Sequence, residues 1–392
     1  METTFDSGEN ITSEGNNKIY KHKRQKLIRI LLVIALIISL IVLFYYYGIK
    51  NRVYKSYSVI KTINCSAEGN VGFEKYKDGF IKYSPDGVSY YNGNKEVWNK
   101  SVSMTNPLVD VKGNYVVIAE KNSNTIKLFN ENGEETGISS TYPIVNVKVS
   151  KSGSVAAILD DGNAAYIETY TKNGEKFASG RTVLSGDGYP IDISVSEDGT
   201  KVVASYLAIS SGTSQSKVVF YNFSEVGQNE VDRIVGGFNH YETTIVPDVE
   251  FINSNTVVAV GDNMYTIYSM DEKPKKIFEQ KFDEKLLSVF YNSEYIGMVF
   301  ESADTSGKKN IKIINTKGKE VTNIETEYIY NEICFNQGYI LMYNSENITM
   351  YSTSAKKIFD KNYKGNINKV IPETKTTLAV IADTKTEIIK LK

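Results

Sequence analysis

The segment PLVDVKGNYVVIAEKNSNTIKLFNENGEETGISS, residues 107–140, is followed by PIVNVKVSKSGSVAAILDDGNAAYIETYTKNGEKFAS, residues 143–179. Each segment begins with a proline and contains short runs of β-branched residues separated by Asn-Gly or Asp-Gly, dipeptides typical of hairpin turns. Within residues 145–149, apolar and polar residues alternate, as in a strand with one buried face. Each segment therefore predicts a unit of four antiparallel strands.

Related units recur along most of the chain. Their starts lie between 36 and 57 residues apart, at Val71, Pro107, Pro143, Pro190, Pro247, Leu287, Tyr328 and Ile367. Four strands repeated at a period of roughly 40–45 residues are typical of a β-propeller, whose blades surround a central axis. The sequence thus predicts an all-β fold, a propeller of eight blades, or of seven if one weak unit is miscounted.

The two ends of the repeat region predict how the ring closes. The last unit contains only three strand-like runs, at residues 367–371, 377–382 and 387–391. A further strand-like run, VYKSYSVIKTIN at residues 53–64, precedes the first unit and has no other partner. We expect this amino-terminal strand to complete the last blade.

An apolar segment precedes the propeller. Residues 30–49, ILLVIALIISLIVLFYYYGI, contain no charge, and a helix of this length at ~1.5 Å per residue spans a bilayer core of ~30 Å. A cleaved signal peptide is the alternative, but its apolar part is usually shorter and ends in small residues. Here the run ends in Tyr45, Tyr46 and Tyr47, which suit the headgroup region. The segment therefore predicts a transmembrane helix.

The charges that flank this segment predict its orientation. Six positive residues precede it within twelve positions, ending at Arg29, whereas Lys50, Arg52 and Lys55 after it are sparser. By the positive-inside rule, the amino terminus lies in the cytoplasm and the carboxy terminus outside. We expect a largely disordered basic cytoplasmic tail at residues 1–29, a single-pass helix at 30–49 and an extracytoplasmic propeller at 50–392. Arg29, the three tyrosines and Lys50 would lie at the membrane interfaces.

Composition excludes several classes of function. The 45 Lys and Arg balance 46 Asp and Glu, a formal net charge of −1 that argues against nucleic acid as a partner. Two His, two Cys and one Trp leave few residues for a metal centre or a His-based triad, and the usual catalytic and phosphate-binding motifs are absent. We therefore expect no metal site, no cofactor and no catalytic residues. Cys65 and Cys334 fall in different blades, so we expect two unpaired thiols.

Three long loops predict a binding surface. Residues 205–217 and 301–309 follow second strands and residues 236–248 join two blades, positions that lie on one face of a propeller. Loops on a rigid scaffold often carry function, although lengthened hairpins are also tolerated without any. The candidate contacts on this face are Tyr206, Phe238, Asn239, His240 and Tyr241. The alternative for His240 is an ordinary surface histidine, since it has no metal-ligand spacing.

Two segments of the sequence resemble repeats of known propellers. IDISVSEDGTKVVASY at residues 191–206 and YSPDG at residues 83–87 resemble repeats of TolB-like and WD40-like proteins, without the Trp-Asp dipeptide of true WD40 blades. The layout of basic tail, single anchor and Tyr-, Asn- and Lys-rich propeller resembles a family of membrane-anchored proteins of Gram-positive Firmicutes, classed as a domain of unknown function. That resemblance supplies no catalytic or ligand residue.

Two functions remain open. The first is a binding or scaffold module on the outer side of the cytoplasmic membrane, anchored in the bilayer through residues 30–49 and engaging a protein or a cell-wall component. The second is an envelope enzyme that acts on a glycan through a pair of carboxylates in the central channel. Acidic side chains clustered near the axis would favour the second.

Overall fold

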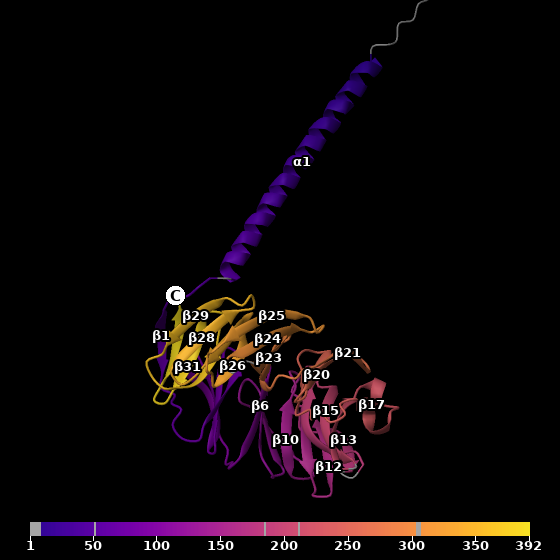
Figure 1. The fold of residues 1–392 in the computed structure, drawn as a ribbon, viewed down its shortest axis with the longest axis vertical. Helices are drawn as coiled ribbons and strands as arrows, with labels where there is room; N and C mark the ends of the chain where they lie inside the picture. The colour runs from indigo at the N-terminus through magenta and orange to yellow at the C-terminus, as the bar shows by residue number, and fades with distance from the viewer. Residues whose placement is uncertain (1–8, 51, 184–185, 211, 303–306) are drawn as a thin grey trace, which may run out of the picture. The chain divides into compact units, whose positions relative to one another are not determined.

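The computed structural model describes residues 9–50, 52–183, 186–210, 212–302 and 307–392. This part of the chain contains one long helix, 32 strands and two single-turn 3-10 helices, η1 (Glu225–Gly227) and η2 (Val231–Arg233). Residues Met1–Val53 and Tyr54–Lys392 form two separate compact units. The helix belongs to the first unit and the strands to the second (Figure 1).

Helix α1 (Glu9–Lys50) contains the expected apolar segment. Within its stretch Lys21–Phe44, a window of 18 residues has a mean hydropathy of 3.2 and contains no buried residue. The helix is therefore long and apolar enough to cross a membrane, a property that a signal sequence near an amino terminus shares. The helix begins at Glu9, within the tail that was expected to be largely disordered. No proline interrupts residues 9–29, so the helix extends backwards from the apolar segment. Arg29 is exposed, whereas the side chains of Tyr45, Tyr46, Tyr47 and Lys50 lie outside the described part.

The strands form eight antiparallel sheets of four strands each, numbered here as blades 1 to 8 in chain order of their inner strands. Blade 1 contains β2 (Gly72–Tyr76), β3 (Gly79–Ser84), β4 (Gly87–Asn92) and β5 (Lys95–Ser101), and blade 2 contains β6 (Pro107–Lys112), β7 (Tyr115–Glu120), β8 (Thr125–Phe129) and β9 (Glu135–Ser139). Blade 3 contains β10 (Ile144–Val149), β11 (Val155–Asp160), β12 (Ala164–Tyr170) and β13 (Lys176–Val183), and blade 4 contains β14 (Tyr189–Val195), β15 (Lys201–Ser210), β16 (Thr213–Asn222) and β17 (Ile234–Phe238). Blade 5 contains β18 (Asp248–Phe251), β19 (Thr256–Val260), β20 (Met264–Met270) and β21 (Pro274–Lys281), and blade 6 contains β22 (Leu286–Tyr291), β23 (Tyr295–Glu301), β24 (Lys309–Asn315) and β25 (Glu320–Thr326). Blade 7 contains β26 (Glu332–Asn336), β27 (Tyr339–Tyr343), β28 (Asn347–Ser352) and β29 (Lys357–Asn362), and blade 8 contains β30 (Ile367–Pro372), β31 (Thr377–Ala382), β32 (Thr386–Leu391) and β1 (Tyr57–Ile63). The predicted all-β propeller with eight blades is confirmed.

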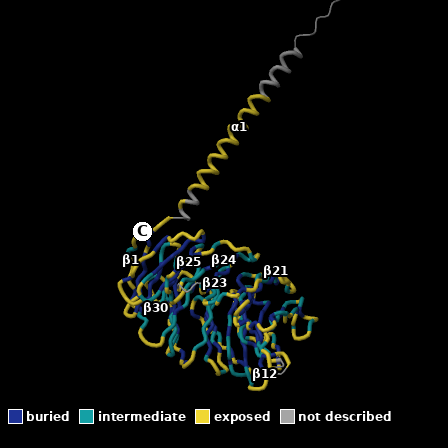
Figure 2. Tube along the Cα trace, in the orientation of Figure 1, coloured by how far each residue is buried: buried dark blue, intermediate teal, exposed yellow. Residues whose placement is uncertain are grey.

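The core lies between the blades. In β7, Val116 and Ile118 pack with residues of blade 1, whereas Val117 and Ala119 pack with residues of blade 3. Because alternate side chains of a strand point to opposite faces, a blade between two neighbours must be apolar on both faces. Second strands such as β19 and β27 therefore consist almost entirely of apolar residues, and the blade interiors are dark blue in Figure 2.

The ring closes through β1. This strand pairs antiparallel with β32, from Tyr57 opposite Leu391 to Ile63 opposite Thr386. Beyond the pairing, the Thr386 hydroxyl donates to the Cys65 carbonyl at 2.8 Å. The amino-terminal strand predicted for the last blade is thus confirmed, and the first and last parts of the propeller sequence share one sheet.

Two of the three expected loops differ in form. Residues 205–217 are mostly a hairpin, since β15 runs to Ser210 and β16 begins at Thr213, with the pairing continuing between those two residues. The β-branched and apolar residues before Ser210 extend the strand instead of ending it. The link between β17 and β18 covers residues 239–247, and residues 303–306 of the third loop lie outside the described part. Cys65 and Cys334 are free thiols, as expected.

Candidate binding site at the central channel

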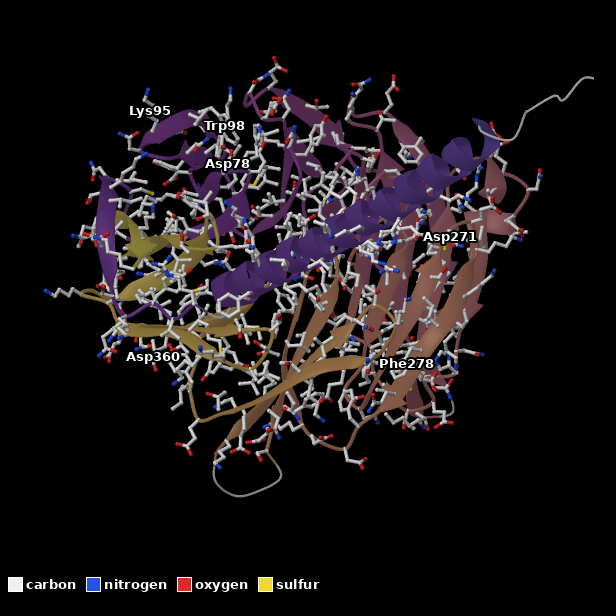
Figure 3. All side chains as sticks on the ribbon, turned by 90° about the horizontal axis from the view of Figure 1, so that it is seen from above. Asp78, Lys95, Trp98, Asp271, Phe278 and Asp360 are labelled. Carbon is white, nitrogen blue, oxygen red and sulfur yellow. The ribbon has the colours of Figure 1, made fainter. Side chains whose placement is uncertain are left out.

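The inner strand of each blade carries polar side chains at alternate positions. In β18, Val249 and Phe251 are buried in the core, whereas Asp248 and Glu250 on the other face are only half-buried. Across the ring, this pattern brings nine charged groups around the axis: Glu74, Asp110, Lys112, Lys148, Asp192, Asp248, Glu250, Glu332 and Lys369. Residues of the outer strands, such as the labelled Trp98 and Phe278, lie instead at the periphery (Figure 3).

Several of these acids connect neighbouring blades. Asp110 of blade 2 accepts a hydrogen bond from the Val149 amide of blade 3 at 2.8 Å. Asp192 of blade 4 likewise accepts from the Val249 amide of blade 5 at 3.0 Å. The Tyr291 hydroxyl of blade 6 donates to Asp248 of blade 5 at 2.5 Å. These carboxylates hold adjacent inner strands together.

One ion pair spans the channel itself. Lys112 Nζ of blade 2 lies 2.6 Å from Glu250 Oε1 of blade 5, three blades further round the ring. The other oxygen of Glu250 accepts from the Ser194 hydroxyl at 2.9 Å. Polar side chains therefore fill the channel at this level.

Burial around the axis shifts the pKa values of these groups. Burial raises the pKa of Asp192 to about 6, against the opposing effects of the Val249 amide and of Lys148. Burial also raises the pKa of Asp110 and that of Asp248. Acidic side chains therefore do cluster at the axis, the arrangement that was expected to favour a glycan-cleaving enzyme.

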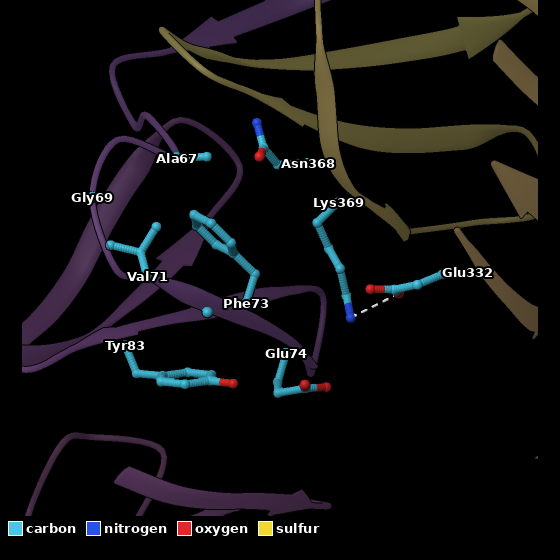
Figure 4. Close-up of a pocket in the computed structure, with 10 residues that line it drawn as sticks. Ala67, Gly69, Val71, Phe73, Glu74, Tyr83, Glu332, Asn368 and Lys369 are labelled. Atoms are coloured by element: carbon cyan, nitrogen blue, oxygen red, sulfur yellow. Dashed lines mark ion pairs between the residues drawn. The ribbon is translucent and has the colours of Figure 1, made fainter. Parts of the chain in front are cut away.

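A cavity of about 350 Å³ opens beside the axis, between the inner strands of blades 1, 7 and 8 and the loop that follows β1 (Figure 4). Its lining combines an apolar part with several polar groups. The lining residues are Ala67, Gly69, Val71, Gly72, Phe73, Glu74, Tyr83, Glu332, Asn368 and Lys369. Residues from both ends of the propeller sequence line the cavity, so closure of the ring brings its lining together.

Two of the charged groups in this cavity, Lys369 and Glu332, form an ion pair, whereas Glu74 does not. Lys369 Nζ lies 2.9 Å from Glu332 Oε2, which also accepts from the Tyr343 hydroxyl at 2.6 Å. Within the described residues, no hydrogen bond or ion pair reaches the Glu74 carboxylate or the Tyr83 hydroxyl. Burial raises the pKa of Glu74, with Lys369 opposing the effect, and burial also raises the pKa of Tyr83. Glu74 and Tyr83 therefore present free polar groups to the cavity.

Gly72 makes room for the tyrosine ring. A Cβ atom at this position would lie 2.1 Å from the Tyr83 ring, far inside van der Waals contact. The absent side chain thus lets the ring of Tyr83 lie across β2 and form one wall of the cavity, beside Glu74 (Figure 4).

The residues expected on the loop face do not form one surface. Tyr206 is 1% exposed, and its hydroxyl lies 2.5 Å from that of Tyr221. It lines a second cavity of about 140 Å³, together with Arg181 and Lys217. Tyr241 is also 1% exposed, in a different core cluster, with its hydroxyl 2.5 Å from that of Tyr268. Burial of both rings leaves neither on an open surface.

Phe238 is the last residue of β17, and Asn239 and His240 begin the link that follows it. Asn239 is exposed, and Phe238 packs against Tyr268 with ring centroids 4.6 Å apart. His240 Nε2 lies 2.8 Å from Glu279 Oε2, a proximity that the sequence did not indicate, but the geometry is not that of a hydrogen bond. Burial lowers the pKa of His240, and Glu279 opposes the effect. Whether these residues bind a ligand stays a prediction.

Sequence reasoning missed the cavity beside the axis. Glu74 and Lys369 are 295 positions apart, and only ring closure brings them together. The sequence did contain a weak indication of a polar site near the axis, because charged residues interrupt otherwise apolar inner strands, as Asp110 does in PLVDVK. Their regular recurrence near the start of each repeat points to the axis.

Comparison with solved structures shows the fold. The chain is similar to BamB from Moraxella catarrhalis, with 13% identity, 86% of this chain and 100% of that chain covered, and a TM-score of 0.52. It is similar to Sqt1 of Saccharomyces cerevisiae, with 9% identity, coverage of 87% and 99%, and a TM-score of 0.57. It is also similar to the WD40 domain of SCAP from fission yeast, with 12% identity, coverage of 86% and 98%, and a TM-score of 0.55.

The expected resemblance to WD40-like propellers is thus confirmed at the level of fold. The search of curated proteins gave no match. A family model, by contrast, matches residues 50–391, nearly the whole propeller unit together with the end of α1. The chain belongs to DUF5711, a family of unknown function.

Proposed function

We propose that this protein is a membrane-anchored binding module. Helix α1 would hold the propeller at the cytoplasmic membrane, with the amino terminus inside and the propeller outside, where it engages a protein or a cell-envelope component. The observation that carries the proposal is the cavity beside the axis, where Glu74 and Tyr83 present unpartnered polar groups on strands of a rigid ring. Polar groups that converge on a preformed cavity are typical of ligand sites.

The hydrogen bonds of the axial acids support binding rather than catalysis. Asp110 and Asp192 accept backbone amides of the next blade, and Glu250 is paired with Lys112. A general acid or base must reach the substrate proton. Carboxylates already engaged in joining blades are poorly placed for that task.

The test is photo-crosslinking in intact cells that naturally make the protein. A photoreactive residue replaces Glu68, which is exposed in the loop lining the cavity, and a second variant carries it at Lys95, exposed at the start of outer strand β5. We expect a discrete adduct from position 68 that position 95 does not give. Equal adducts from both positions, or none from position 68, would contradict a binding module that uses this cavity.

One observation favours the second candidate, an envelope enzyme acting on a glycan. A carboxyl group with a pKa near 6, as burial gives Asp192, suits a general acid at neutral pH. If this candidate is correct, the purified full-length protein releases soluble sugar from cell-wall glycan, and Asp192→Asn abolishes the release. Absence of release by the wild-type protein would exclude this candidate for that substrate.

A further inference from the structure

We propose that the cavity beside the axis binds an alkylammonium group, with the Glu74 carboxylate as its anionic partner and the Tyr83 side chain as a second contact. The inference rests on the proposed binding function and specifies the chemistry of its ligand. The group could belong to a free polyamine or to a lysine-like side chain of an envelope peptide, which share this chemistry.

The charge balance of the cavity favours a cation. Its lining contains two carboxylates, Glu74 and Glu332, and one ammonium group, Lys369. Lys369 is paired with Glu332 at 2.9 Å and attracts the Glu74 carboxylate only from beyond hydrogen-bonding distance, so Glu74 has no cation in direct contact in the described part of the chain. A ligand ammonium group would supply that contact as a charge-assisted hydrogen bond.

The charges around the wider channel also favour a cationic ligand. The nine charged groups around the axis comprise six carboxylates and three lysines, a difference of 3 − 6 = −3 when all are ionised. An excess of carboxylates over ammonium groups makes the electrostatic potential of a cleft negative, which concentrates positive counter-ions there. The channel therefore attracts cations to its rim and disfavours anionic ligands.

The accessible lining is mainly polar, and its smaller apolar part can contact an alkyl chain that carries the charge. Phe73, 5% exposed, and Val71 contribute apolar surface, and Tyr83 adds an aromatic ring next to Glu74 (Figure 4). An ammonium group attracts both a carboxylate and an aromatic face, while its methylene groups can contact apolar side chains. The volume of about 350 Å³ lies in the usual range for small-ligand sites, ~300–1,000 Å³.

Calorimetric titration of the full-length protein in detergent micelles tests the inference. The probes are 1,5-diaminopentane, Nα-acetyl-lysine N-methylamide, neutral 1,5-pentanediol and the dianion glutarate. We expect binding of one or both ammonium probes and no binding of the diol or the dianion. Preference for the diamine would identify free polyamines as the source, and preference for the lysine derivative would identify a peptide side chain.

Matched variants locate the site. Glu74→Gln keeps the shape of the side chain but loses the charge, so we expect the affinity for the ammonium probe to fall by about tenfold or more. Tyr83→Phe, which removes only the hydroxyl, should weaken binding less. The control is Glu294→Gln, which removes the same charge from an exposed turn of blade 6 and should leave the affinity unchanged. Thermal unfolding of each variant checks that the propeller is intact.

The inference is overturned if no ammonium probe binds at millimolar concentration, if the diol binds as tightly as the diamine, or if both Glu74→Gln and Tyr83→Phe bind like the wild-type protein. These outcomes are separable from failure of the proposed function. An adduct from position 68 that persists in Glu74→Gln would leave a binding module whose ligand is not an ammonium group. Ammonium binding without any adduct would support the site and contradict the macromolecular partner.

Discussion

At the residue scale, Glu168 shows how a carboxylate is held inside a blade. Its side chain is 2% exposed and accepts hydrogen bonds from the hydroxyls of Tyr170 at 2.5 Å and Thr141 at 2.9 Å, and from Lys176 at 3.0 Å. Burial alone would raise the pKa of Glu168, but these bonds outweigh it and hold the pKa below its usual value. The ionised form is therefore the one that stabilises blade 3.

Replacing this carboxylate should destabilise the propeller. Glu168→Ala removes the acceptor shared by these three donors and by the Ser179 hydroxyl, which lies 3.4 Å away, so we expect the free energy of unfolding to fall by about 3 kcal/mol in urea titrations. Because the folded pKa is depressed, the wild-type contribution is present above pH 4.5 and is lost as the pH falls below it. The control is Glu175→Ala in the neighbouring exposed turn, where a change within about 0.5 kcal/mol is expected. An equal effect of both variants would contradict this account.

Asp192 should show the opposite dependence on pH. Its folded pKa is raised from 3.8 to about 6, so the folded state holds the proton more tightly and stability falls as the pH rises through that window. The groups that face it include Lys148 and Asp248, as well as the Val249 amide. Asp192→Asn keeps an oxygen for that amide but cannot ionise. We expect the stability of this variant relative to the wild-type protein to increase between pH 4 and 6.

Urea unfolding measured at several pH values checks this expectation. The comparison variant is Asp78→Asn, which removes an exposed carboxylate from the turn between β2 and β3. A constant difference between Asp192→Asn and the wild-type protein across the window would show that Asp192 is not the group that titrates there.

The identity of a residue alone did not reveal whether the candidate contact residues near the long loops are exposed or buried. Tyr206 and Tyr241 were selected because they lie near long loops, yet both rings pair with other tyrosines in the core. A tyrosine in a β-rich sequence serves a core or a surface equally well, because its ring is apolar and its hydroxyl needs one partner. The neighbouring Asn239 is exposed, as a binding residue must be.

At the element scale, strand β1 determines whether the ring is closed. It supplies the outer strand of blade 8, and backbone bonds continue beyond it, from Tyr54 to Ile358 at 2.8 Å and from Lys392 to Ser56 at 2.9 Å. The sequence predicted this pairing by counting strands, since three strands at one end and one at the other complete a blade. Hairpin lengths were less predictable, because the β15–β16 extension depends on pairing that neither strand specifies alone.

An engineered disulfide tests this closure. Ser58 lies opposite Lys390 in the β1–β32 pair, and facing residues of antiparallel strands are close enough for a disulfide. Oxidised Ser58→Cys/Lys390→Cys should form the crosslink and raise the free energy of unfolding by about 2–4 kcal/mol, because it closes a very long loop. The control pair, Ser58→Cys/Thr125→Cys, joins blades 8 and 2 and should not crosslink. A crosslink in the control pair but not in the first would contradict the observed closure.

At the scale of the whole molecule, the chain combines an exposed apolar helix with a separate propeller. If the helix is an uncleaved anchor, the full-length protein sediments with membranes, and alkaline phosphatase fused to its carboxy terminus is active outside the cell. Leu36→Arg/Leu40→Arg places two charges in the apolar stretch, at a cost of about 2.5–3.5 kcal/mol each, and should release the protein from the membrane fraction.

Leu36→Ile/Leu40→Ile is the matched control and should stay in the membrane. Mass spectrometry of the mature protein distinguishes an anchor from a signal sequence. Loss of the residues before the propeller would contradict the anchor, and an inactive carboxy-terminal fusion would contradict the orientation.

The sequence by itself determined the class of fold, the closing strand and the apolar helix, and it limited the number of blades to eight or seven. These features follow from local periodicity and from counting, since alternation of side chains, turn dipeptides and uninterrupted apolar runs are properties of neighbouring residues. Only the tertiary structure decided which tyrosines are buried and which charged groups meet. Glu74, Glu332 and Lys369 lie in three blades from opposite ends of the propeller sequence, and the closed ring alone places them around one cavity.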